Sequence, residues 1–263
     1  MTAGRTLYVS DPVVLITGAL TGIGRATALA YARRGANLVV SGRHEDVGEP
    51  FARELSGLGA PTEFVRADVR FETDVKDLVD RAVARFGRID VAFNNAGTAG
   101  TPGPVTEVTE EDYQATFDTN VKGTLLCLKH EFRVMREQGG GSIVNVSSVY
   151  GLMGYPGAAL YVGSKHAVVG ITKAAALEGA AHGIRVNAVA PGFTRTALYE
   201  QFTGNETARD AVDSVLPMHR AGTPEEIAEA LQYLGSDKAS YLNGHVLTVD
   251  GGLTAGGPLF PSS

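Results

Sequence analysis

The sequence has few of the residues that would tie a protein to a disulfide framework, a metal or a membrane. The 263-residue chain contains no tryptophan and a single cysteine, Cys127, which cannot form an internal disulfide. Cys127 also lacks the partners of a cysteine-based metal site, and the six histidines are scattered without ligand-like spacing. We therefore expect no metal site and a reducing compartment, the cytoplasm.

Long apolar runs and basic tracts are missing as well. No apolar run approaches the roughly 20 residues needed to cross a bilayer, and the stretch 13–16 is too short for the core of a signal peptide. The formal net charge is −6, and the lysines and arginines are not clustered as phosphate binding requires. We expect neither a membrane nor a nucleic acid as partner.

Glycine and alternating apolar segments are abundant instead. The chain has 33 glycines and is 44% hydrophobic, which suits one α/β domain over residues 1–263. Several expected strands are continuous apolar runs, typical of parallel strands covered on both faces. The pattern predicts a Rossmann-type, doubly wound parallel sheet of about seven strands with helices on both faces. Expected strands are 13–17, 37–41, 63–66, 90–93, 142–146, 185–190 and 245–249; expected helices are 24–34, 45–56, 72–86, 110–136, 158–181 and 224–234, with 191–217 irregular or weakly helical.

A glycine-rich turn joins the first strand to the first helix. Its sequence is Thr17-Gly18-Ala19-Leu20-Thr21-Gly22-Ile23-Gly24. Free N–H groups and the helix dipole at such a turn favour a bound pyrophosphate. Gly18 lets the chain turn, Gly22 lets a phosphate approach and Gly24 lets the helix pack on the strand. The alternative is a tight turn that binds nothing.

Tyr161 and Lys165 are four residues apart in a helical pattern, so their side chains share one face. A nearby ammonium should lower the pKa of a phenol toward the working pH and make it a better acid and base. Ser148 follows the fifth strand, at the edge where open α/β sheets bind ligands. Its neighbour Ser147 points the opposite way on a strand. Asn120, in an otherwise apolar helix, needs a polar partner.

Together these motifs, with Asn94-Asn95-Ala96-Gly97 and Pro191-Gly192, resemble the classical short-chain dehydrogenase/reductase family from about residue 11 to 252. The thirteen-residue interval to Tyr161 selects Ser148 rather than Ser147. The resemblance implies that Ser148 donates a hydrogen bond to the substrate oxygen and that Tyr161 transfers a proton. It implies that Lys165 tunes Tyr161 and binds the nicotinamide ribose, and that Asn120 holds a water leading to solvent.

The resemblance also implies a nicotinamide dinucleotide as cofactor. Asp68 would hold the adenine amino group with Val69 packed near it, and Asn94 and Gly97 would lie beside the adenine ribose. Read without the family, Asn94–Gly97 is an ordinary turn. The remaining implied cofactor-binding residues are Gly18, Thr21, Gly22, Ile23, Gly24, Pro191, Gly192 and Thr194, together with Tyr161 and Lys165.

The residues after the second strand bear on which nucleotide binds. The run is Ser41-Gly42-Arg43-His44, with no carboxylate at position 42 to bind a ribose 2′-hydroxyl. Arg43 is placed to clamp a 2′-phosphate, which favours NADP(H). The alternative is that Arg43 is only a solvated surface charge and that NAD(H) still binds.

Three segments, 98–105, 149–157 and 193–215, should frame the substrate, with 194–210 as a lid. Their apolar side chains favour a neutral ketone or secondary alcohol, although they could equally belong to the core; they are Tyr150, Met153, Tyr155, Phe193, Leu198, Tyr199 and Phe202. A 3-oxoacyl-thioester reductase, a sugar dehydrogenase and a non-catalytic dinucleotide sensor are the alternatives.

Apolar residues cover more of the helix 158–177 than one buried side needs, which indicates a subunit contact. Because proteins of the resembled family are commonly dimers or tetramers, we expect a homotetramer.

Overall fold

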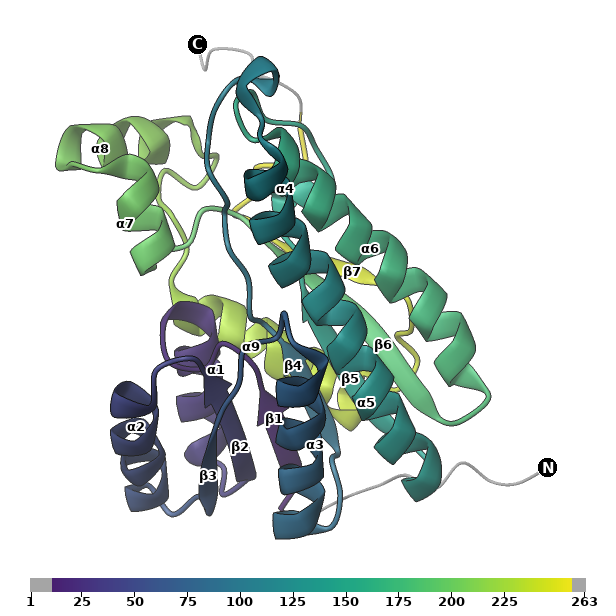
Figure 1. The fold of residues 1–263 in the computed structure, drawn as a ribbon. Helices are drawn as coiled ribbons and strands as arrows, with labels where there is room; N and C mark the ends of the chain where they lie inside the picture. The colour runs from purple at the N-terminus through teal and green to yellow at the C-terminus, as the bar shows by residue number, and fades with distance from the viewer. Residues whose placement is uncertain (1–10, 257–263) are drawn as a thin grey trace.

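Seven parallel strands form one sheet in a computed structural model of the chain, which describes residues 11–256 (Figure 1). The strand order is β3-β2-β1-β4-β5-β6-β7, which confirms the predicted doubly wound sheet. The strands are β1 Val13–Ile16, β2 Asn37–Gly42, β3 Thr62–Arg66, β4 Val91–Asn94, β5 Gly141–Val146, β6 Ile184–Pro191 and β7 Val246–Val249.

Helices cover both faces of this sheet because the central strands are apolar on both sides. One core joins strand residues such as Ile16 and Val40 to α1 (Gly22–Ala32), α2 (Glu45–Gly57) and α9 (Pro224–Gly235). A second core joins Leu15 and Ile143 to α3 (Glu72–Phe86), α5 (Gly123–Gln138) and α6 (Ala159–Ala180). The strand order reverses between β1 and β4, which is where ligands of open α/β sheets bind.

The expected helix 110–136 is present as an unbroken helical segment, but it contains a π-helical turn that was not expected. The segment consists of α4 (Glu110–Phe117), a π-helical turn (Asp118–Lys122) and α5. A π turn inserts one extra residue into the helix and so changes the direction of the side chains on it. The turn carries Asn120, and such turns often occur at functional sites.

The segment after β6 is more ordered than expected. It forms α7 (Ala197–Thr203) and α8 (Glu206–Val215), which stand away from the sheet at the upper left of Figure 1. Thr196 and Asn205 begin the two helices, since their side chains accept hydrogen bonds from the backbone N–H groups of Tyr199 and Ala208. Gly204, with φ +71°, makes the turn between them. The side chain of Phe202 lies outside the described part of the structure.

Candidate active site

The glycine-rich turn between β1 and α1 is held in shape by the loop after β4. Gly18 and Gly22 have φ values of +63° and +52°, a region that side chains disfavour. Asn95 fixes the turn, because its Nδ2 donates to the carbonyls of Thr17 (3.1 Å) and Gly18 (2.9 Å). A side chain at Gly24 would collide with the Gly18 carbonyl. Sequence reasoning assigned no role to Asn95, although its place in the Asn-Asn-Ala-Gly run was a signal.

The N-terminus of α1 fits an anion. Thr21 precedes the helix but makes no side-chain capping bond, and the first turn carries no acidic residue. The backbone N–H groups of the first turn of α1 are therefore available to an incoming ligand. Ile23 packs against the hydrophobic core between the sheet and α1, α2 and α9, and so anchors the turn. The residues present fit the pyrophosphate of a dinucleotide.

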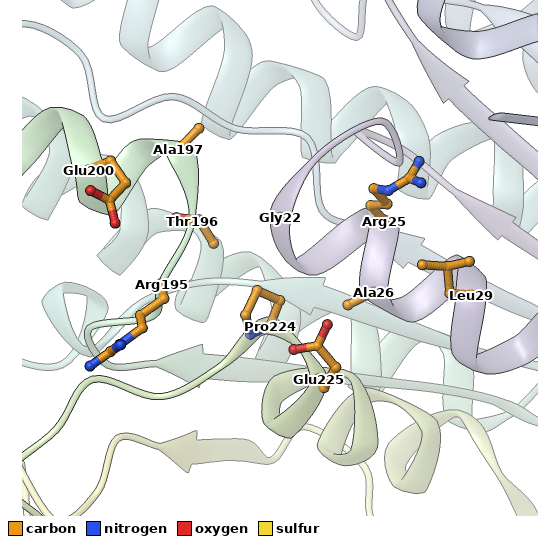
Figure 2. Close-up of a pocket in the computed structure, with 10 residues that line it drawn as sticks. All are labelled: Gly22, Arg25, Ala26, Leu29, Arg195, Thr196, Ala197, Glu200, Pro224 and Glu225. Atoms are coloured by element: carbon orange, nitrogen blue, oxygen red, sulfur yellow. The ribbon is translucent and has the colours of Figure 1, made fainter. Parts of the chain in front are cut away.

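Across from this turn lies the start of α7, where Figure 2 shows Thr196 opposite Gly22. A Cβ added at Gly22 would lie 3.0 Å from Thr196 Cγ2. The two residues border a pocket of about 350 Å³ that Arg25 of α1 and Pro224 of α9 also line. This pocket extends outward from the phosphate end, and the expected catalytic residues do not line it. Thr196 was missed in the sequence, although its position before a helix could have indicated a cap.

The loops after β2 and β3 face each other at the expected adenosine end. The Ala67 N–H donates to the Gly42 carbonyl (3.0 Å). The Asp68 carboxylate accepts from Arg70 Nη2 (2.6 Å), and this bond lowers the pKa of Asp68, to which the charge of Arg43 also contributes. Arg43 itself is exposed.

Two further features shape this end. A Cβ added at Gly42 would lie 2.6 Å from Leu20 Cδ1, so Leu20 fills the space of an acidic side chain there. Val69 packs with Val75 and Cys127 in a small buried cluster below the loop.

At the carboxyl edge of β5, the Ser148 side chain lies close enough to the Tyr161 hydroxyl to act as a hydrogen-bond donor that lowers the pKa of the phenol. Ser148 Oγ also accepts from the backbone N–H of Tyr150 (3.2 Å). The neighbouring hydroxyl of Ser147 points elsewhere and donates to the carbonyl of Lys165 (3.0 Å). The structure thus brings Ser148, and not Ser147, to the phenol.

The protonation of Tyr161 differs from our expectation. Burial raises its pKa above 10, and the Ser148 hydrogen bond offsets only part of that rise. Lys165 Nζ lies 5.7 Å from the centroid of the Tyr161 ring and donates to the carbonyl of Val146 (3.0 Å). Because Lys165 is fully enclosed, burial lowers the pKa of its ammonium to about 8. The net shift of the phenol pKa is therefore upward, and not downward as expected.

Asn120 joins this group from the π turn. Its Oδ1 accepts from the Thr98 N–H (2.8 Å), and its Nδ2 donates to the Thr98 carbonyl and to Ser164 Oγ (both 2.9 Å). Above it, a Cβ added at Gly97 would lie 3.2 Å from Asn120 Oδ1 and 3.4 Å from Lys165 Nζ. Gly97 therefore leaves open the space beside the amide and the ammonium.

The segment after β6 approaches the same edge. Gly192 follows Pro191, the last residue of β6, and its N–H donates to the Val249 carbonyl (2.9 Å). A Cβ at Gly192 would lie 2.8 Å from Asp250 Cα, so only glycine fits there. Thr194 is buried and its hydroxyl donates back to Gly192 (3.1 Å).

The side chain of Asn94 is not brought to this group. Asn94 ends β4, and its Nδ2 donates into the core, to Glu131 Oε2 (3.1 Å) and Asn145 Oδ1 (3.0 Å). Glu131 on α5 is completely buried, and burial raises its carboxyl pKa to about 7. Sequence reasoning missed Glu131, because its partner is 37 residues away.

Within residues 11–256, no three His, Cys, Asp or Glu side chains are grouped so that they could hold a metal ion. In the same range, no helix is both long and apolar enough to pass through a bilayer.

Known proteins are similar to this chain in sequence and in fold. A family model described as Enoyl-(Acyl carrier protein) reductase matches residues 18–254. An A-factor type gamma-butyrolactone 1'-reductase (1S-forming) of Streptomyces virginiae is 44% identical, over 95% of this chain and 98% of its own length. The crystal structure of levodione reductase superposes with a TM-score of 0.90 at 37% identity, covering 94% of this chain and 98% of that one. The structure of ElxO with NADP bound gives a TM-score of 0.88 at 35% identity, covering 94% of this chain and all of that one.

Proposed function

Because this chain belongs to the short-chain dehydrogenase/reductase family of oxidoreductases acting on alcohols and carbonyl compounds with NAD(P)(H), we propose that it interconverts a neutral ketone and a secondary alcohol. The observation that supports this most directly is the proximity of the Ser148 and Tyr161 side chains, close enough for Ser148 to lower the phenol pKa, with the buried ammonium of Lys165 beneath the ring. Two hydroxyls at one point provide a pair of donors for one carbonyl oxygen.

In reduction, the Ser148 hydroxyl donates a hydrogen bond to the carbonyl oxygen and so stabilises the negative charge that develops there. Tyr161 gives its proton to the same oxygen, and in oxidation it removes that proton from the alcohol. The nicotinamide supplies or accepts the hydride. The raised pKa of Tyr161 keeps the phenol protonated at neutral pH, which suits a proton donor.

Lys165 and Asn120 support this proton transfer. The ammonium of Lys165 stabilises the phenolate that Tyr161 leaves behind, because opposite charges attract strongly in a buried site. With a pKa of about 8, Lys165 can also return a proton near neutral pH. Asn120 is fixed by two hydrogen bonds to the backbone of Thr98 and would hold a water that links Lys165 to solvent.

For the cofactor we favour NADP(H) over NAD(H). Arg43 is exposed at the end of β2, and its charge reaches the adenosine end, where it contributes to the low pKa of Asp68. Position 42 carries no carboxylate that could bind a ribose 2′-hydroxyl. Leu20 occupies the space that such a side chain would need. The binding of NADP by the structural relative ElxO agrees with this choice.

An acyl thioester is the alternative suggested by the matching family model, that of an enoyl-(acyl carrier protein) reductase. Such a substrate carries an anionic carrier, which calls for free basic side chains near the site. In the described part of the chain, Arg195, Arg209 and Arg220 around α7 and α8 each already pair with a carboxylate. A small neutral ketone therefore fits this surface better. A sugar substrate would need more polar walls, and a mere sensor would not need Ser148 and Tyr161 together.

We propose a homotetramer as the assembly. Leu177 on α6 is 81% exposed, and Tyr241 before β7 is fully exposed. Exposed large apolar side chains of this kind are typical of subunit contacts, and a tetramer with D2 symmetry needs more than one such contact.

The test of the proposed reaction is a panel of neutral ketones, a 3-oxoacyl thioester and a ketose, each offered with NADPH and with NADH. Consumption of reduced nicotinamide is followed by absorbance. We expect turnover of ketones with NADPH. No turnover of any compound despite tight NADPH binding would favour the non-catalytic sensor. Turnover of the thioester alone would favour the 3-oxoacyl-thioester reductase.

A further inference from the structure

Tyr150 lies at the centre of the aromatic side chains around the catalytic phenol. Its ring centroid is 6.3 Å from that of Tyr161 at an interplanar angle of 77°, and 6.3 Å from that of Phe193 at 90°. On its other side it packs against Tyr155, with centroids 4.9 Å apart. The rings of Tyr161 and Phe193 are nearly perpendicular to that of Tyr150, so the three rings form a corner with flat walls beside the catalytic phenol.

The backbone holds this ring in a fixed position. Tyr150 belongs to a short 3-10 turn, Val149–Gly151, and its N–H donates to Ser148 Oγ (3.2 Å). Val149 is buried, and a Cβ at Gly151 would lie 2.8 Å from the Lys165 carbonyl. The turn is thus packed closely against α6, and the ring that it carries is further held by its contacts with Tyr155, Tyr161 and Phe193.

The corner is uncharged. Burial raises the pKa of the Tyr150 phenol, and the neighbouring Tyr155 and Tyr161 raise it further, so the ring remains neutral at any working pH. A neutral wall with flat aromatic faces stacks well against another flat or compact ring. A flexible chain would lose its rotational freedom there, whereas a ring has little to lose.

We propose that Tyr150 is the specificity-determining residue of this site and that it selects ketones and secondary alcohols that carry a ring next to the reacting carbon or include that carbon in a ring. The Tyr150 ring stands edge-on to the Tyr161 ring, and the backbone N–H of Tyr150 is bonded to Ser148 Oγ, so a carbonyl oxygen held by these two residues would bring its substituents next to Tyr150. This inference rests on the proposed function.

Cyclohexanol and 2-hexanol test the proposal, since both are secondary alcohols with six carbons. The measured quantity is the ratio of kcat/KM for cyclohexanol to that for 2-hexanol, with NADP as the oxidant. We expect the wild-type enzyme to prefer cyclohexanol. Tyr150→Phe, which keeps the ring, should preserve the ratio. Tyr150→Leu should lower kcat/KM for cyclohexanol about tenfold, or about 1.4 kcal/mol, chiefly through KM, and affect 2-hexanol much less.

A matched control is Tyr113→Leu, which removes a half-exposed ring stacked on Phe117 of α4, outside the aromatic corner. This control should leave the ratio unchanged. Thermal melts followed by circular dichroism should show that the variants remain folded. A wild-type enzyme without preference for the ring, or an equal loss for both alcohols in Tyr150→Leu, would overturn the proposal.

Ligand binding separates this proposal from the proposed function. Cyclohexanone is added to the enzyme–NADPH complex, and nucleotide fluorescence reports its binding. Binding that Tyr150→Leu weakens, without turnover of any ketone, would contradict the proposed function and support the role of Tyr150. Equal turnover of both alcohols would support the proposed function and contradict the role of Tyr150. Neither binding nor turnover would overturn both.

Discussion

Replacing Glu131 by glutamine should stabilise the protein, and the gain should depend on pH. Glu131 is fully buried on α5, and its only side-chain bond within the described residues comes from Asn94 Nδ2 (3.1 Å). Glu131 Oε1 and Asn94 Oδ1 both have no partner in that range. A proton on the carboxyl, or the amide N–H of a glutamine, supplies the donor that these two acceptors lack.

The magnitude follows from the pKa of the carboxyl. Burial raises this pKa from 4.5 to about 7 in the folded protein. The folded state therefore holds the proton more tightly than the unfolded state, and ionising Glu131 costs folding free energy. Its contribution to stability is intact below pH 4.5 and is lost as the pH rises through 7. At pH 8 the loss amounts to about 3 kcal/mol, since each pKa unit corresponds to about 1.4 kcal/mol.

Chemical denaturation of the wild type and of Glu131→Gln at several pH values measures this effect. At pH 8 the variant should have the higher free energy of unfolding, by about 2–3 kcal/mol once imperfect amide geometry is allowed for. At pH 4.5 the two proteins should have nearly equal stability. A variant that is less stable than the wild type by the same amount at both pH values would refute a neutralised buried carboxyl.

Four further changes test the cofactor site and the assembly. Arg43→Ala should weaken NADPH binding about 10- to 100-fold, by removing a charge-assisted bond, and leave NADH binding unchanged in fluorescence titrations; equal effects on both would remove Arg43 from the 2′-phosphate. The double change Leu20→Ala with Gly42→Asp should shift preference toward NADH, because the smaller residue frees the space that a carboxylate needs. Gly22→Val should weaken both nucleotides alike, since φ is +52° there and a side chain meets Thr196; unchanged titrations would place the pyrophosphate elsewhere. Leu177→Lys should reduce the mass measured by light scattering, and a wild type that is already monomeric would contradict the tetramer.

The fold could be predicted because apolar runs and glycines fix it locally. Val13–Ile16 is buried throughout, as a continuous apolar run suggests, and the seven expected strands agree with the structure to within a residue or two. The π turn at Asp118–Lys122 could not be predicted, because apolar periodicity does not reveal one inserted residue. The segment of α7 and α8 was expected to be only irregular or weakly helical, although Thr196 and Asn205 are ordinary capping residues.

At the site, spacing predicted which side chains would meet but not their protonation. Tyr161 and Lys165 share one helix face, as a four-residue interval requires. Lys165 also donates to the carbonyl of Val146 at the end of β5, a contact set by packing between α6 and the sheet. Glu131 follows Lys129 and His130 and reads as part of a polar surface, whereas the helix turns it into the core. The local sequence pattern does not reveal contacts between residues that lie far apart in the chain.

The most direct test of the account is turnover by Tyr161→Phe, which removes one hydroxyl and keeps the ring. We expect ketone reduction to fall about 10²- to 10⁴-fold, the usual contribution of an acid/base group, while the Kd for NADPH changes little. Reduction at close to the wild-type rate in a variant that binds NADPH normally would show that another group delivers the proton.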